Sequence, residues 1–287
     1  MSRRVRFTKG HGTRNDFVLL DDRDGEFTLT ATTAAALADR RSGIGGDGVI
    51  RVAPTATAGD ASVRDLADAA PWFMDYRNAD GSTAQMCGNG VRVFATYLRR
   101  EGLAPAEGFP VATRDGIKHV RFVGDQVVVD MGQWRVLDEA EAADGMDALV
   151  HVPEHQPFSA LRLDLGNPHT VVALPPSVDL DELDLSAAPL VKPHPASGTN
   201  VEFVQPLGPG HIRMRVHERG VGETQSCGTG VCAAALATHI WAGDLDMDAP
   251  WIVDVPGGRL TVRLLPGRRV ELSGPAVLVA DGTVDLP

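Results

Sequence analysis

Apolar and polar positions alternate through most of this chain, which predicts a protein built mainly of β-strands. Stretches rich in β-branched residues are separated by turn residues along the whole sequence. The clearest strand patterns fall at residues 17–20, 48–52, 126–131, 161–165, 169–174, 211–217 and 258–265.

Helical spacing of apolar residues is found in few segments, and we expect helices at residues 33–41, 91–100 and 231–241. Within the second of these, Val91, Phe94 and Leu98 recur on one helical face. Residues 53–70 are rich in Ala, Thr, Asp and Gly, which predicts a mobile surface loop. The chain therefore belongs to the α/β (α+β) class, with strands dominating.

The composition of the chain limits the classes of ligand that it is expected to bind. The 287 residues correspond to about two domains of ~100–200 residues each. With 27 basic against 38 acidic residues, the net charge of −11 argues against nucleic acid or an anionic membrane. No apolar run approaches the ~18 residues of a membrane helix. Three cysteines without a framework pattern favour reduced thiols in the cytoplasm. A small-molecule substrate is the expected ligand.

An internal duplication is the most informative feature, because three short motifs occur twice in the same order. The third motif, Gln-x-Cys-Gly-x-Gly-Val, covers residues 85–91 and 225–231 and contains Cys87 and Cys227. Two similar halves would bring these sulfurs to a shared cleft from opposite sides. The other two pairs of motifs are centred on Asn15 and Asn167, and on Asp47 and Asn200.

Each Cys-Gly-x-Gly motif lies directly before a predicted helix, and this position has chemical consequences. The glycines permit a tight turn, and the unpaired N–H groups of the first helical turn can bind a carboxylate. The positive helix end also favours a thiolate. An enzyme that removes a proton from one face of a carbon and returns one to the other face needs a matched base and acid. Cys87 and Cys227 are the candidates.

Other chemistries fit the residues less well. Cys227 and Cys232 lack the spacing of a metal site, and Cys232 is expected in the core. A cysteine nucleophile paired with His169 or His217 remains a rival, although a hydrolase gains nothing from a second motif. The Gly-x-Gly-x-x-Gly pattern in residues 43–48 follows a helix and precedes a strand, the reverse of a dinucleotide site.

Several motifs with functional side chains are spread over nearly the whole chain. They are His11-Gly12-x-x-Asn15-Asp16-Phe17, Asn78-Ala79-Asp80-Gly81-Ser82, Cys87-Gly88-Asn89-Gly90, Gly166-Asn167-Pro168-His169, Asn200, Glu218-Arg219-Gly220-x-Gly222-Glu223-Thr224 and Cys227-Gly228-Thr229-Gly230. In these motifs the chain resembles the diaminopimelate epimerase family. The resemblance implies two pseudo-symmetric halves, each a mostly antiparallel curled sheet around a central helix, with the active site in the cleft between them. The halves would span residues 1–130 plus 276–287, carrying Cys87, and 131–275, carrying Cys227.

The family interconverts L,L- and meso-2,6-diaminopimelate, on the route to lysine and peptidoglycan, without cofactor or metal. The resemblance implies that Cys87 and Cys227 are the acid/base pair, and that His169 and Glu218 tune the pKa values. Members often form homodimers, so a homodimer is an open alternative. The substrate would be held at its reacting carboxylate by Gly88, Asn89, Gly228 and Thr229, and at its far end by Asn15, Asn78, Asn167, Asn200, Glu218 and Arg219.

Three further alternatives stay open. A related proline or hydroxyproline racemase would share the paired thiols, but its substrate gives Arg219 and the extra asparagines nothing to hold. A dithiol redox protein would cycle Cys87 and Cys227 through a disulfide. An amino acid binding module would use the same donors without turnover. One departure from the family is Gly48, where many relatives carry Gln, and no substrate contact is assigned there.

Overall fold

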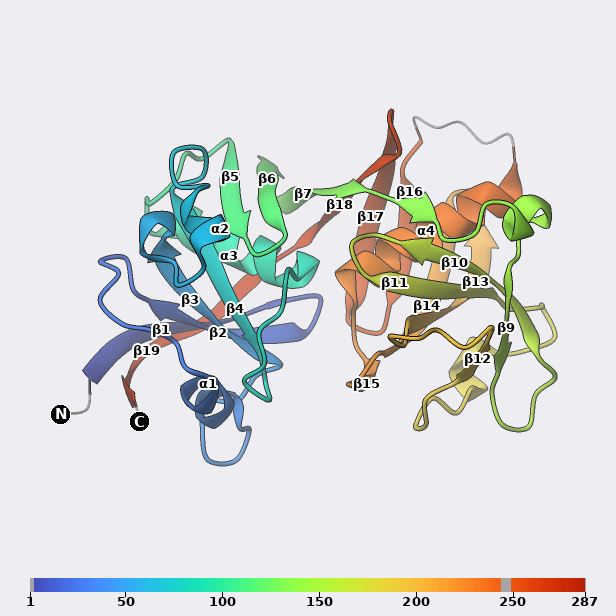
Figure 1. Ribbon diagram of the computed structural model, residues 1–287, viewed down its shortest axis with the longest axis horizontal. Helices are drawn as coiled ribbons and strands as arrows, with labels where there is room; N and C mark the ends of the chain where they lie inside the picture. The colour runs from blue at the N-terminus through green and yellow to red at the C-terminus, as the bar shows by residue number, and fades with distance from the viewer. Residues whose placement is uncertain (1–2, 244–248, 287) are drawn as a thin grey trace. The chain divides into compact units, whose positions relative to one another are not determined.

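The computed structural model describes residues 3–243 and 249–286 and divides into two compact units. Unit 1 comprises Met1–Asp130 and Gly274–Pro287, and unit 2 comprises Met131–Ser273. Strand β7 (Gln126–Gln133) carries the chain from the first unit into the second, and β18 (Arg269–Pro275) brings it back (Figure 1).

Unit 1 is a mostly antiparallel sheet in the order β19-β1-β2-β3-β4-β5-β6-β7. Parallel pairing occurs between β2 and β3 and between β4 and β5. The strands are β1 (Arg3–Gly12), β2 (Asn15–Asp21), β3 (Gly48–Pro54), β4 (Trp72–Asn78), β5 (Gly108–Thr113), β6 (Gly116–Val123) and β19 (Val277–Leu286), and the helices are α1 (Ala31–Ala38), η1 (Thr55–Thr57), α2 (Ala61–Arg64) and α3 (Gly88–Arg100).

Helix α3 is the central helix of unit 1. It packs against β1, β2, β3, β4 and β19 (Figure 1). Val91, Phe94 and Leu98 are fully buried, as their helical spacing requires of a core face. The helix thereby presents its N-terminus, capped by Cys87, at a fixed place relative to the sheet.

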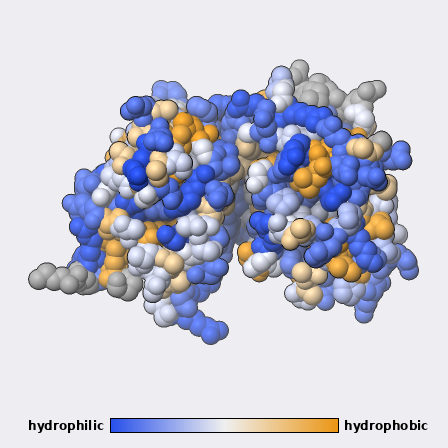
Figure 2. Space-filling model, in the orientation of Figure 1, coloured by the Kyte–Doolittle hydropathy of each residue, from blue (hydrophilic) through white to orange (hydrophobic). Residues whose placement is uncertain are grey.

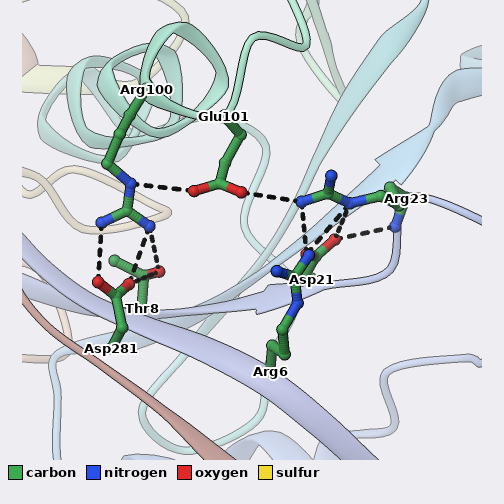
Figure 3. A network of polar contacts seen from close by, with 7 residues as sticks. All are labelled: Arg6, Thr8, Asp21, Arg23, Arg100, Glu101 and Asp281. Carbon is green, nitrogen blue, oxygen red and sulfur yellow. Dashed lines mark hydrogen bonds and ion pairs between the residues drawn. The ribbon is translucent and has the colours of Figure 1, made fainter.

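An ion-pair network lies at the C-terminal end of α3 (Figure 3). Arg100 Nη2 lies 2.8 Å from Asp281 Oδ1 on β19, and Arg23 Nη2 lies 3.1 Å from Glu101 Oε2. Asp21 on β2 accepts hydrogen bonds from Arg23 and from Arg6 on β1. The network therefore links α3, β1, β2 and the returning strand β19.

Unit 2 has a sheet in the order β12-β9-β10-β11-β13-β14-β16-β17-β18, with β8 on β10 and β15 on β14. β11/β13 and β14/β16 are parallel. The elements are β8 (Arg135–Val136), η2 (Glu141–Asp144), β9 (Ala148–His151), β10 (Phe158–Asp164), β11 (Pro168–Ala173), η3 (Leu180–Glu182), β12 (Leu190–Lys192), β13 (Asn200–Gly208), β14 (His211–Glu218), β15 (Gly222–Thr224), α4 (Gly228–Ala242), β16 (Trp251–Val255) and β17 (Gly258–Leu265).

The two units repeat one arrangement of elements. In unit 1, β2 and β3 run parallel, β4 returns antiparallel, and α3 follows. In unit 2, β11 and β13 run parallel, β14 returns antiparallel, and α4 follows after the short β15. The pairing register of unit 2 differs by one position from the sequence repeat: Phe17 pairs with Gly48, whereas its counterpart His169 pairs with Asn200, the counterpart of Asp47. The predicted strand-rich α/β class with two similar halves is confirmed.

The structure differs from the sequence predictions in two segments. The first helix begins at Ala31 because the Thr30 side chain accepts a hydrogen bond from Thr33 N and so caps it. Residues 53–70 are not a surface loop throughout: the short helices η1 and α2 lie there, and Val63 and Ala70 are buried beside Phe73. The apolar residues of segment 53–70 are too widely spaced to show a helical or strand period in the sequence.

The face in Figure 2 is mostly hydrophilic, with small separate hydrophobic patches. Among the described residues, no helix combines the length and the apolar character that crossing a membrane would require.

Candidate active site

In unit 1 the site is built around Cys87, which caps the N-terminus of α3. The backbone N–H of Gly90 donates to Cys87 Sγ at 3.5 Å, and Sγ lies 3.7 Å from Asn15 Oδ1. Gly88 and Asn89 are buried in the first helical turn. The helix start therefore holds the sulfur among N–H donors, in the positive end of the helix dipole.

Asn15, at the start of β2, lies at the centre of a hydrogen-bonded group. Its Oδ1 accepts from Asn89 Nδ2 at 3.1 Å, and its Nδ2 donates to Asp47 Oδ2 at 2.7 Å. Asp47 is itself paired with Arg40 at 2.7 Å. The fully buried Arg92 donates from Nη2 to Asn89 Oδ1 at 2.9 Å. These contacts fix both asparagine side chains beside Cys87.

Asn78 ends β4 directly opposite Gly48, the first residue of β3. Its Nδ2 donates to Ser82 Oγ at 3.0 Å. Because β2 and β3 begin at the sheet end where β4 finishes, Asn15, Asp47 and Asn78 come from adjacent strand ends. A Cβ atom at Gly48 would lie 2.5 Å from the Tyr76 ring, so a side chain at this position would be crowded.

In unit 2 the equivalent position belongs to Cys227, which caps α4 and is 7% exposed. Its Sγ lies 3.6 Å from the hydroxyl oxygen of Thr229. Burial, followed by the negative charges of Glu218 and Glu202, raises the pKa of the Cys227 thiol well above its usual range. Cys232 is fully buried in α4, as predicted for a core residue.

Asn167 and His169 extend from the start of β11 toward Thr229. Asn167 Nδ2 donates to Thr229 Oγ1 at 3.3 Å, and Asn167 Oδ1 lies 3.0 Å from His169 Nε2. On the other side of the ring, His169 Nδ1 lies 2.7 Å from Glu202 Oε1 on β13. His169 and Glu202 are both fully buried.

Glu218, Arg219 and Asn200 complete the predicted residues of unit 2. Burial raises the pKa of Glu218, whose Oε1 accepts a hydrogen bond from the Thr224 hydroxyl. Asn200 Oδ1 accepts from the backbone N–H of Arg219 at 3.0 Å. The Arg219 guanidinium is exposed and donates from Nη1 to Ser197 O at 2.9 Å, which leaves its remaining donors accessible.

Within each unit the structure gathers the predicted residues, but sequence reasoning assigned no site role to three others. Asp47, Arg92 and Glu202 each hold a predicted residue in place. Glu202 had a signal, since it interrupts the apolar run of β13 between Val201 and Phe203. In the described part of the chain, no group of His, Cys, Asp and Glu side chains is arranged to hold a metal ion.

Solved structures with 16% identity or less share the fold. A hydroxyproline epimerase from Agrobacterium vitis aligns with a TM-score of 0.68, 16% identity, and coverage of 100% of this chain and 94% of that chain. A PhzF-family phenazine biosynthesis protein from Bacillus anthracis aligns with a TM-score of 0.67, 15% identity, and coverage of 98% and 99%.

Curated relatives are much more similar in sequence. The diaminopimelate epimerase of Thermobifida fusca (strain YX) is 49% identical, over 98% of this chain and 98% of the relative. That of Streptomyces coelicolor is 47% identical, over 99% and 97%. The diaminopimelate epimerase family model matches residues 7–137 and 162–279. The chain therefore belongs to the diaminopimelate epimerase family.

Proposed function

We propose that this isomerase converts L,L- into meso-2,6-diaminopimelate by a proton transfer that uses Cys87 and Cys227. The observation that carries the proposal is the repeat: each unit places a cysteine as the cap of a buried Gly-x-Gly helix start, after the same arrangement of strands. A mechanism with a single nucleophile would not require two such capped helix starts. A two-base mechanism requires one acid/base group on each face of the substrate carbon.

In the proposed reaction, one cysteine acts as thiolate and removes the α-hydrogen, and the other acts as thiol and protonates the opposite face. The proton lost from the carbon stays on the first sulfur, and the second sulfur becomes the thiolate. The carbanion between the two steps carries its charge into the α-carboxylate. Gly88, Asn89, Gly228 and Thr229, at the starts of α3 and α4, would hold that carboxylate through backbone N–H donors.

The distant amino acid group of the substrate would be held by polar side chains at the strand ends. Arg219 can grip a carboxylate with two parallel hydrogen bonds, and its exposed guanidinium supports this role. Each asparagine offers both donors and an acceptor, as a zwitterion requires. We assign this part of the site to Asn15, Asn78, Asn167, Asn200, Glu218 and Arg219.

The raised pKa of the Cys227 thiol supports a resting state in which this sulfur keeps its proton. Cys227 would then be ready to act as the acid when Cys87 is the base. His169 and Glu218 would adjust the proton affinity on the unit 2 side, because Glu218 adds a negative charge near Cys227 and burial raises the pKa of Glu218 itself.

The experiment is incubation with L,L-diaminopimelate in heavy water without added cofactor. We expect meso product and deuterium at the α-carbon. NMR and mass spectrometry would measure both. Cys87→Ala and Cys227→Ala should each reduce epimerisation by at least about 10²-fold, the usual contribution of a general acid or base. Cys232→Ala is the matched control and should stay active, because this thiol is buried within α4. Turnover by either Ala variant at the parent rate would refute the mechanism.

Parallel assays separate the alternatives. Activity on trans-4-hydroxy-L-proline with none on diaminopimelate would favour the racemase alternative. Full epimerase activity with Cys87 and Cys227 joined in a disulfide would contradict the role given to the thiols. We further propose a cytoplasmic enzyme that acts on the free amino acid, with neither nucleic acid nor membrane as partner. The homodimer that the family resemblance implies can be tested by sedimentation equilibrium.

A further inference from the structure

Glu202 is a buried carboxylate on β13 to which the proposed reaction gives no part. Its side chain is fully buried, and its Oε1 lies 2.7 Å from His169 Nδ1. Its Oε2 has no hydrogen-bond partner among the described residues. A carboxylate buried in this way costs stability unless something nearby compensates its charge.

Two features compensate the charge of Glu202. The first is the His169 imidazole, which can carry a positive charge against Oε1. The second is the N-terminus of α4: a Cβ atom at Gly230 would lie 2.7 Å from Glu202 Oε1, so only glycine lets the helix start approach this closely. The same Cβ would lie 3.3 Å from Cys227 Sγ, so the carboxylate and the sulfur share one helix end.

A continuous chain of polar contacts joins Glu202 to Cys227. After the Glu202–His169 contact, His169 Nε2 lies 3.0 Å from Asn167 Oδ1. Asn167 Nδ2 then donates to Thr229 Oγ1 at 3.3 Å, and Thr229 Oγ1 lies 3.6 Å from Cys227 Sγ. Every member belongs to unit 2.

The direction of each hydrogen bond in this chain depends on the charge of the ring. Both ring nitrogens of His169 face oxygen atoms, and only an imidazolium can donate to both. Asn167 then accepts with Oδ1 and donates with Nδ2, so Thr229 accepts and has its hydroxyl hydrogen left for Cys227 Sγ. A neutral ring that donates to Glu202 would accept a hydrogen bond at Nε2, so the Asn167 amide would be rotated to place Nδ2 toward the ring. Thr229 would then donate to Asn167 Oδ1 and accept from the S–H group of Cys227.

We propose that Glu202 is a positioning residue which, by holding His169 as an imidazolium, directs the Thr229 hydroxyl at Cys227 Sγ and so favours the thiolate at this sulfur. The inference rests on the proposed two-cysteine reaction. No proton crosses the amide: the proton of Cys227 passes only to and from the substrate carbon. The hydroxyl donor offsets burial and the negative charges of Glu218 and of Glu202 itself, all of which oppose the thiolate.

The test is Glu202→Gln, which keeps the shape of the side chain and removes its charge. Each thiol is alkylated with iodoacetamide across a pH series, and the modified peptides are quantified by mass spectrometry. Loss of the donated hydrogen bond should move the midpoint for Cys227 upward by about one pH unit. Cys87, in unit 1, is the control within the same molecule, and its midpoint should not move.

The sign of this shift separates the proposal from a simple charge effect. If Glu202 acted only by repelling the thiolate, its removal would lower the Cys227 midpoint. A lowered or unchanged midpoint therefore overturns the proposal. In steady-state assays we expect kcat for diaminopimelate to fall roughly 10- to 100-fold, while KM changes less than about threefold. Equal kcat values for the parent and the variant would also count against it.

A second measurement uses the unaltered protein and remains informative if the Gln variant does not fold. NMR of the ¹⁵N-histidine-labelled chain should show both nitrogens of His169 protonated, with the assignment made by loss of these signals in His169→Gln. A neutral ring would refute the proposal. Neither the histidine NMR nor the alkylation midpoint depends on turnover. Absence of deuterium exchange in the parent enzyme would refute the proposed function, whereas the role of Glu202 would still be decided by the NMR and alkylation measurements.

Discussion

Asn89 Nδ2 donates to Asn15 Oδ1 at 3.1 Å, which joins the first turn of α3 to the first residue of β2. Asn15 is held on its other side by Asp47 Oδ2, and Asn89 by Arg92. An amide whose donor and acceptor are both engaged keeps a single orientation. Asp47 therefore controls how Asn15 faces the proposed substrate.

Removing Asp47 should weaken substrate binding. In Asp47→Ala the Asn15 amide loses its acceptor, and one hydrogen bond of this kind corresponds to about a tenfold increase in KM for diaminopimelate. Steady-state kinetics would measure it. Asp184→Ala is the control, since this exposed residue accepts from Ser186 N in unit 2. Unchanged kinetics in the Asp47 variant would contradict the orienting role.

Gly48 should tolerate no side chain. A Cβ atom there would lie 2.5 Å from the Tyr76 ring and 2.6 Å from Arg77 O. We expect Gly48→Ala to destabilise the protein by about 1–3 kcal/mol, as overpacking does. In Gly59→Ala the added atom has nothing within 4 Å, so this variant serves as the comparison. Urea unfolding of both variants would measure the difference, and equal midpoints would disprove the crowding.

Glu218→Gln should stabilise the fold at neutral pH while reducing activity. Burial raises the folded pKa of Glu218, so its stabilising contribution is present below the unfolded value of about 4.5 and is lost as pH rises through the folded value. Gln cannot ionise, so it avoids this loss. The thermal midpoint should exceed that of the parent at pH 7 and match it near pH 4. Glu182→Gln, on the exposed turn η3, should change neither quantity.

Asp21→Asn should have the opposite pH dependence. Burial tends to raise the pKa of Asp21, but the hydrogen bond and charge of Arg23 and the charge of Arg6 outweigh it and lower the pKa. The stability from this carboxylate is therefore present above the unfolded value of 3.8 and is lost as pH falls through the folded value. At pH 7 we expect a loss of about 1–3 kcal/mol in urea unfolding. The loss should shrink as pH falls below 3.8. Asp24→Asn, at an exposed position, is the control.

The sequence predicted the elements that depend on local pattern and missed contacts that depend on the tertiary fold. The β-branched run in residues 48–52 and the helical spacing in 91–100 identified β3 and α3, and most residues of both elements are buried. Cys87 and Cys227 were found as helix caps because the repeat marked both. The repeat marked Asp47 without revealing its role, and Arg92 was not marked, because their partners lie far along the chain or inside the core.

The pairing of β1 with β19 has a consequence for biosynthesis. Arg3 pairs with Leu286, and the register continues to His11 opposite Val277. Strand β1 is therefore synthesised well before its partner β19. During translation the outer edge of β1 lacks this partner, and an open strand edge is a template for association with other chains. Unit 1 therefore completes its sheet only after the ribosome has released β19, whereas unit 2 can close earlier.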